Sequence, residues 1–259
     1  MRFVAILALG LVGCGGSGPG AASPSAVVWS YEGEGAPARW AELDPAFATC
    51  AKGTRQSPVD FPGHLTRGSS KAPPLPHWDP VPVRVTNNGH FVMIEDTAPS
   101  SFVFEGTTYA LKQFHFHVPS EHTIDGRAYD AEMHLVHKSA DGKTLVIAVL
   151  LQRGPENELL KPFFSAMPVF ARPDPVVVPG QTIDLSTLLP KSPSYIRYDG
   201  SLTAPPCTEG VTWLVVEPDP DALVHLSDAQ MGRLRAVMHG PTARPTQPSN
   251  GREVYELAP

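Results

Sequence analysis

Three histidines in two neighbouring segments have the spacing of metal ligands. His115 and His117 lie two residues apart in Gln113–His117, and His134 follows in Glu132–Val136. Residues two apart in a β-strand point to the same face, so the His115 and His117 imidazoles point the same way. If the second segment pairs beside the first, three neutral nitrogens can converge on one divalent ion. Three protein ligands leave one position open for water or substrate, which is typical of a catalytic site.

Two polar residues stand where the proposed ligands need hydrogen-bond partners. Gln113 lies two residues before His115, and Glu132 lies two residues before His134. A side-chain oxygen there can accept the N–H of the imidazole nitrogen that does not bind the metal, which fixes the tautomer and orientation of the ring. A single strand histidine is more often an ordinary core or surface residue. Two such pairs favour the metal site over that alternative.

The elements that must position these residues are strands. Strand-like segments occur at Pro82–Asn87, Phe91–Glu95, Ser101–Phe104, Thr108–Val118, Tyr129–Lys138, Leu145–Arg153 and Val211–Glu217. The 29 prolines crowd Pro73–Pro82, Pro168–Pro179, Pro190–Pro193 and Pro241–Pro248, which therefore cannot be central strands or helix interiors. Helical patterns are confined to Glu156–Met167 and to a capping box of Ser227 with Gln230. We predict a mainly β (α+β) domain with a large, mostly antiparallel, twisted central sheet and small peripheral helices.

The N-terminus has the pattern of a secretory signal. Arg2 precedes an apolar run over residues 3–11 that is too short to span a bilayer, and Leu11–Cys14 resembles the lipobox of bacterial lipoproteins. We predict a signal peptide over residues 1–13 and acylation of Cys14; an ordinary signal peptide cut slightly later is the alternative. We therefore expect an exported protein, periplasmic or at the cell surface, attached to a bacterial membrane only by this N-terminal lipid anchor.

The remaining chain is interpreted as one tethered domain. Residues 15–27 consist of Gly, Ser, Pro and Ala with one valine, so we predict a flexible linker. Residues 28–257 have an even composition, which favours a single catalytic domain. A net charge of −6 provides no basic surface for nucleic acid, so the expected partner is a small molecule. The sequence leaves the oligomeric state open, with a homodimer as one option.

Several sequence blocks together resemble the α-class carbonic anhydrases. The blocks are Trp29–Tyr31, Arg55–Asp60, Asn87–His90, Gln113–His117, Ser120–Thr123, Ala131–His137 and Gly200–Pro206. They occur in the order and at intervals similar to those of the family. The resemblance covers nearly all of the chain after the N-terminal segment, and it implies the same mainly antiparallel fold.

The resemblance implies a zinc enzyme that hydrates carbon dioxide. One zinc ion held by His115, His117 and His134 would lower the pKa of its bound water to about 7, the value established for carbonic anhydrase itself. The zinc-bound hydroxide would then attack carbon dioxide reversibly, giving bicarbonate and a proton. Weak ester hydrolysis is an expected side activity.

The resemblance also assigns an orienting pair, Thr203 and Glu121. An ionised carboxylate can only accept hydrogen bonds, so Glu121 would direct the Thr203 proton toward itself. The Thr203 oxygen would then present an acceptor to the zinc-bound hydroxide. Taken alone, Thr203 is an ordinary loop threonine and Glu121 a surface acid.

Further residues match the family's substrate wall and proton path. Val136, Val146, Leu202 and Trp213 match the apolar wall beside the metal. His90 matches the proton shuttle, because an imidazole can pass protons both ways near neutral pH. Tyr31 and Asn88 match residues that order the intervening waters. Met93 and Ala204 depart from the commonest polar residues, which affects the expected water network and not the metal.

The three cysteines of the chain are consistent with export. If Cys14 carries lipid, Cys50 and Cys207 remain to pair in an oxidising compartment. The resemblance implies the same disulfide, since many exported members of the family pair cysteines at these positions. Two buried free thiols are the alternative.

Two other functions remain open at this point. His115, His117 and Glu121 also fit the first half of a cupin motif, which would make an iron or manganese enzyme, although the later part of that motif is not found where it is expected. The second alternative is a non-catalytic binding module related to carbonic anhydrase. The presence of all three histidines with Thr203 and Glu121 disfavours it.

Overall fold

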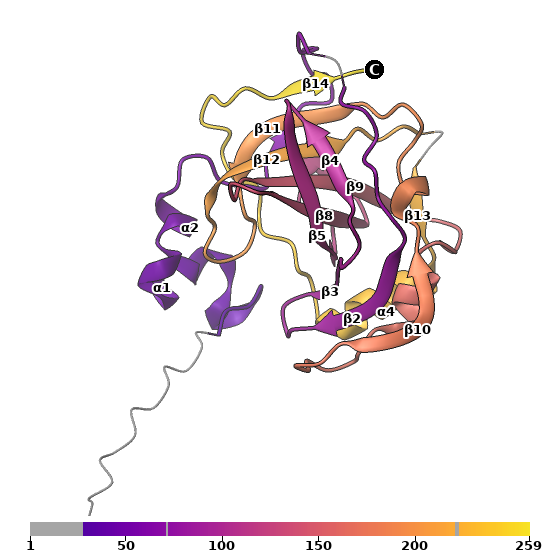
Figure 1. Ribbon diagram of the computed structural model, residues 1–259. Helices are drawn as coiled ribbons and strands as arrows, with labels where there is room; N and C mark the ends of the chain where they lie inside the picture. Colours follow the sequence, from indigo (N-terminus) through magenta and orange to yellow (C-terminus); the bar gives the residue numbers. More distant parts are fainter. Residues whose placement is uncertain (1–27, 71, 221–222) are drawn as a thin grey trace, which may run out of the picture.

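A large twisted β-sheet organises the computed structural model, which describes residues 28–70, 72–220 and 223–259 (Figure 1). The sheet has eleven strands in the order β10-β2-β3-β5-β8-β9-β12-β11-β14, with β13 beside β9 and β4 beside β5. Their bounds are β2 Val81–Asn87, β3 Val92–Glu95, β4 Ser101–Phe104, β5 Thr107–His117, β8 Ala131–Ser139, β9 Thr144–Arg153, β10 Val176–Ile183, β11 Tyr195–Ser201, β12 Glu209–Val216, β13 Val224–Leu226 and β14 Tyr255–Leu257. A small second sheet contains β1 Asp60–Phe61, β6 Thr123–Ile124 and β7 Arg127–Ala128.

The predicted fold class is confirmed. Within the described part of the large sheet, only the pairings of β9 with β12 and β13 are parallel. The helices are short: α1 Trp40–Leu43, α2 Thr49–Lys52, α3 Lys161–Ala166 and α4 Asp228–Met238. Every predicted strand segment overlaps an observed strand. The predicted capping box is present at α4, where Ser227 and Gln230 bond reciprocally.

Some elements differ from the prediction. Strands β10 and β11 were not predicted, and β10 begins inside the proline-rich stretch Pro168–Pro179. Because β10 lies at the edge of the sheet and its register shifts between Val177 and Thr182, Pro179 interrupts no central ladder. Helix α3 begins at Lys161, later than expected, and the Asn157 side chain accepts the Leu160 N–H in the preceding turn.

Alternation along the strands divides the interior into two cores. On β5, Phe114 and Phe116 enter the main core and pack against Phe163 of α3. The opposite face of the sheet carries His115 and His117, and a second core lies beside them. The members of this second core are Val59, Phe61, Val146, Ala148, Leu150, Ile196, Tyr198, Val211, Trp213 and Val215. The predicted strand pattern therefore separates the histidine face from the larger apolar core.

A disulfide joins Cys50 and Cys207, as predicted, with a Cα–Cα distance of 5.0 Å and a sequence separation of 157. It connects α2 to the loop that follows Thr203. In the loop-entropy model, a closure of this length stabilises the folded state by about 4 to 5 kcal/mol. The bond therefore restrains the loop that carries one member of the proposed orienting pair.

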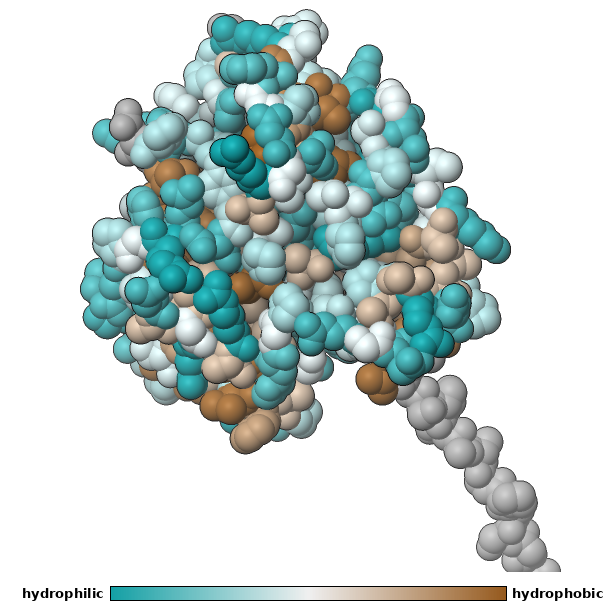
Figure 2. Space-filling model, turned by 180° about the vertical axis from the view of Figure 1, so that it is seen from behind, coloured by the Kyte–Doolittle hydropathy of each residue, from teal (hydrophilic) through white to brown (hydrophobic). Residues whose placement is uncertain are grey.

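The predicted leader lies outside the described residues. This applies to the signal peptide of residues 1–13, to Cys14 and to the linker of residues 15–27, and these stay predictions. Within residues 28–70, 72–220 and 223–259, no helix has the length and apolar character needed to cross a membrane. Figure 2 shows hydrophobic residues scattered in small groups among hydrophilic ones on the face it presents. The homodimer also stays a prediction.

Candidate metal centre

The register of β5 and β8 brings the three histidines together. His115 lies directly opposite His134, and His117 lies directly opposite Glu132. The Nε2 atoms of His115 and His117 are 3.1 Å apart. The ring centroid of His134 lies 5.2 Å from that of His115 and 4.6 Å from that of His117. One nitrogen of each ring lies within 4.8 Å of the other two. The predicted convergence of the three imidazoles is therefore observed.

The outer nitrogen of each imidazole has an oxygen partner. Gln113 Oε1 lies 2.8 Å from His115 Nδ1, and Glu132 Oε1 lies 2.7 Å from His134 Nε2, as the spacing predicted. His117 Nδ1 lies 2.7 Å from the backbone oxygen of Thr242. Sequence reasoning missed Thr242, because any residue type can supply a backbone oxygen. These contacts leave one nitrogen on each ring facing the centre of the group.

Burial keeps these imidazoles neutral. His117 is fully buried, and burial followed by the neighbouring His134 lowers its pKa to about 3. Burial also lowers the pKa of His115 and His134 below the ordinary value of 6.5. A neutral imidazole has a free lone pair for a metal, so the group is ready to bind at neutral pH. Three imidazoles at this spacing fit a zinc ion.

Glu132 is a buried acceptor for four N–H groups. It accepts from the backbone of Glu121 and His122, both at 2.8 Å, from His122 Nδ1 at 2.6 Å and from His134 Nε2 at 2.7 Å. Burial alone would raise the pKa of Glu132, but His122 and His134 together hold it well below its usual range. His122 Nε2 lies 2.6 Å from the Tyr198 hydroxyl, so both nitrogens of this histidine have a partner. Because the Glu132 oxygens are already occupied, His122, Glu132 and His134 form a supporting layer and no second metal site.

The surroundings of Glu121 act on its carboxyl group in opposite directions. Oε1 accepts the Arg244 backbone N–H at 2.9 Å, whereas Oε2 lies 3.5 Å from His117 Nε2 and has no hydrogen-bond partner among the described residues. Burial, followed by the charge of Glu132, raises the pKa of Glu121 well above its usual range, against the opposing effects of Thr203 and Arg244. The net effect of the surrounding protein is to raise this pKa. A dication in the site would act in the opposite direction.

An apolar wall extends from the histidines across neighbouring strands. Val136 lies opposite Val146 on β9, which in turn lies opposite Trp213 on β12. The Trp213 ring centroid is 4.9 Å from that of His134, and Leu202 packs against the same core. The four predicted wall residues are thus brought to the histidine face of the sheet.

The opposite side of the site is also apolar. Met93 on β3 lies directly opposite His115. The Phe91 ring centroid is 4.9 Å from the His115 ring and 5.4 Å from the His117 ring. Sequence reasoning did not single out Phe91. Alternation could have found it, because Phe91 lies two residues before Met93 in the predicted strand segment Phe91–Glu95 and so shares its face.

The residues matched to the proton path lie at one side of the site. His90 stacks on Trp29, with ring centroids 3.9 Å apart and planes within 3°. His90, Tyr31 and Thr242 line a common cavity of about 200 Å³, so the cavity reaches the residue that supports His117. The Tyr31 hydroxyl is buried without a partner among the described residues. Asn88 Oδ1 accepts the His90 N–H at 2.9 Å and thereby holds the turn.

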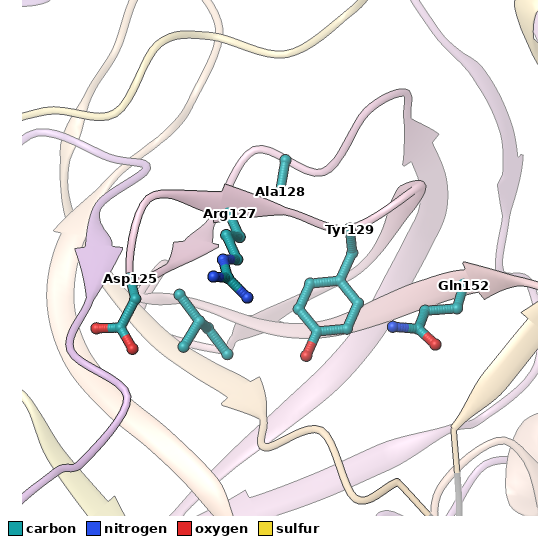
Figure 3. Close-up of a pocket in the computed structure, with 6 residues that line it drawn as sticks. Asp125, Arg127, Ala128, Tyr129 and Gln152 are labelled. Carbon is teal, nitrogen blue, oxygen red and sulfur yellow. The ribbon is translucent and has the colours of Figure 1, made fainter.

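A larger cavity of about 500 Å³ lies apart from this centre (Figure 3). It is lined by the β6–β7 hairpin and by Gln152 of β9, with Arg127 and Tyr129 directed into it. None of the three histidines lines it. Its volume therefore does not identify the chemical site, whereas the convergence of ligands does.

Comparison with known proteins gives consistent results. Residues 35–258 match the family model for eukaryotic-type carbonic anhydrase. A carbonic anhydrase of Klebsiella pneumoniae is 40% identical over 230 residues, covering 88% of this chain and 90% of that protein. One of Neisseria gonorrhoeae is 40% identical over 230 residues, covering 88% and 87%. The alpha-carbonic anhydrase of Thermovibrio ammonificans, solved with the inhibitor sulfanilamide, has a TM-score of 0.82 at 35% identity and covers 89% of this chain and 100% of that one.

Replacing Glu132 by Gln should weaken zinc binding by roughly 10- to 100-fold, the usual effect of removing an outer hydrogen-bond partner. The amide keeps one acceptor oxygen but directs an NH₂ group at N–H donors. Competition with a chelator measures the zinc dissociation constant. Glu105→Gln, at an exposed position between β4 and β5, is the matched control. An unchanged dissociation constant in Glu132→Gln would contradict the supporting role.

Proposed function

Because the chain belongs to the eukaryotic-type (alpha) carbonic anhydrase family, we propose that it hydrates carbon dioxide reversibly with one zinc ion held by His115, His117 and His134. The observation that carries this proposal is the convergence of three buried imidazoles, each with its outer nitrogen next to an oxygen. When bound, zinc lowers the pKa of a coordinated water to about 7, as established for carbonic anhydrase, and so supplies hydroxide at neutral pH.

The protein's contribution begins with orientation. The Arg244 backbone N–H fixes one Glu121 oxygen, and the Thr203 side chain interacts with the same carboxyl group. With Glu121 ionised, Thr203 donates its proton to the carboxylate and presents only an acceptor lone pair to the site. A reactant with a proton to donate is then preferred and held in one orientation.

The apolar wall suits an uncharged substrate. Carbon dioxide carries no net charge and no hydrogen-bond donor, so Val136, Val146, Leu202 and Trp213 can hold it by contact alone. Bicarbonate is charged and is poorly solvated by the same surface. This difference favours release of the product to water.

His90 is proposed to carry the proton away from the site. Its ring is half-buried against Trp29 and lines the cavity that reaches Thr242. Burial lowers the pKa of His90 below 6.5. The imidazole is therefore neutral at physiological pH and able to accept a proton.

The two alternative functions are wrong. The chain matches the carbonic anhydrase family and is 40% identical to a carbonic anhydrase over 88% of its length, which contradicts the cupin-like interpretation. The relatives at 40% identity are named as carbonic anhydrases, which are enzymes, and this contradicts the interpretation as a non-catalytic binding module.

Export and lipid anchoring at Cys14 are proposed on the leader sequence. The Cys50–Cys207 disulfide supports them, because such bonds persist in oxidising compartments. Labelling of cells with a radioactive fatty acid should mark the wild-type protein and leave Cys14→Ser unmarked. Equal labelling of both would exclude this anchor.

The proposed activity is tested by stopped-flow measurement of carbon dioxide hydration with purified, zinc-loaded protein. His134→Ala should lose zinc and lower the rate by at least about 100-fold, because one of three metal ligands is removed. His225→Ala, a half-buried histidine outside the site, is the control. Wild-type activity in His134→Ala would place the reaction elsewhere.

His90→Ala should slow hydration about 100-fold in weak buffer, the lower end of the usual contribution of general acid–base catalysis, and added imidazole should partly restore it. The shuttle accepts protons only when it is neutral. The His90-dependent part of the rate should therefore rise with pH through a midpoint below 6.5. Stopped-flow rates at several buffer concentrations and pH values measure both effects. A rate independent of buffer in wild type and variant would remove the role.

A further inference from the structure

Phe91 covers the side of the site opposite the apolar wall. Its ring is tilted by 47° to the His115 ring at 4.9 Å and by 68° to the His117 ring at 5.4 Å. Phe91 is half-buried, so it keeps some exposed surface. Val92, the next residue, is buried in the main core on the other side of β3. Phe91 therefore occupies space directly beside two of the three proposed ligands.

Neighbouring residues hold the Phe91 ring in place. Trp29 approaches it from behind, with ring centroids 6.0 Å apart, and Trp29 is itself stacked on His90. Asn88 Oδ1 accepts the Phe91 N–H at 2.8 Å and fixes the turn that carries the ring. An aromatic side chain packed in this way has few alternative positions. The ring is thus held beside His115 and His117.

The three histidines consequently have apolar groups on two sides. Phe91 and Met93 line the β3 side, and Val136, Leu202 and Trp213 line the other. A three-atom linear molecule such as carbon dioxide has no side group to collide with the ring. We expect a compound that carries a benzene ring next to its metal-binding or reacting group to collide with Phe91, because the Phe91 ring lies beside two of the three histidines.

We infer that Phe91 is a specificity-determining residue that restricts the site to small reactants and disfavours aryl-bearing substrates and inhibitors. This inference rests on the proposed function, because it concerns access to the same three histidines. It is a steric effect, so removal of the ring should favour large compounds over small ones. A residue that only supported the ligands would affect large and small compounds equally.

The experiment compares zinc-loaded wild type, Phe91→Ala and Phe91→Leu with two reactants. The ratio of kcat/KM for 4-nitrophenyl acetate to kcat/KM for carbon dioxide should rise about 10-fold in Phe91→Ala, the lower end of the discrimination that a pocket exerts on one misplaced group. Phe91→Leu keeps part of the bulk and should lie between the other two. Phe170→Ala, at a side chain that is 74% exposed, is the matched control and should leave the ratio unchanged.

A binding measurement gives a second readout. Calorimetry should show that Phe91→Ala binds sulfanilamide about 10-fold more tightly relative to thiocyanate, a small linear anion, for the same steric reason. Zinc content is measured for every variant. If the wild type hydrates carbon dioxide but neither ratio rises in Phe91→Ala, the inference is overturned while the proposed function stands. If the zinc-loaded wild type does not hydrate carbon dioxide, the proposed function itself fails.

Discussion

The pairing of β5 with β8 in a single register is the constraint on which the site depends. It sets His115 opposite His134 and His117 opposite Glu132, so all three proposed ligands and one supporting carboxylate meet across one strand boundary. A slip of one residue would turn His134 to the opposite face of the sheet. The buried residues on the other face of β8, Met133 and Leu135, oppose such a slip because it would turn them from the main core to the histidine side. The apolar core therefore stabilises the geometry of the polar site.

Glu132 connects this register to the rest of the centre. A buried carboxylate is costly unless its oxygens are satisfied, and this one accepts four N–H groups. From Glu132 the contacts continue through His122 to Tyr198, whose hydroxyl donates to Ser57 Oγ at 2.9 Å. Ser57 Oγ also accepts the Ser201 N–H at 3.0 Å, just before Leu202 and Thr203. The orientation of one metal ligand and the position of the Thr203 loop are thus linked through buried hydrogen bonds.

Much of this arrangement could be predicted because it follows from alternation along strands. His115, His117 and Gln113 share a face by spacing alone, and so do Glu132 and His134. The oxygen of Thr242 and the backbone N–H of Arg244 could not be predicted in this way, because they come from a distant loop and any residue type can supply them. Strand β10 was missed for a different reason. Its prolines exclude a central strand but not an edge strand.

The site combines a small polar centre with apolar surroundings, and this limits how it can discriminate between reactants. Beyond the histidines, the polar side chains assigned to orienting the reactants are Thr203 and Glu121, which Arg244 fixes from behind. The wall residue Trp213 uses its own indole N–H in a bond to the Ser201 backbone, so it offers only its apolar surface to the site. The described wall residues therefore carry no charged group that could bind a reactant. The site must distinguish reactants by the direction of the hydrogen bond at Thr203 and by the space available to them. The residues that set that space are as much part of the chemistry as those that hold the ion.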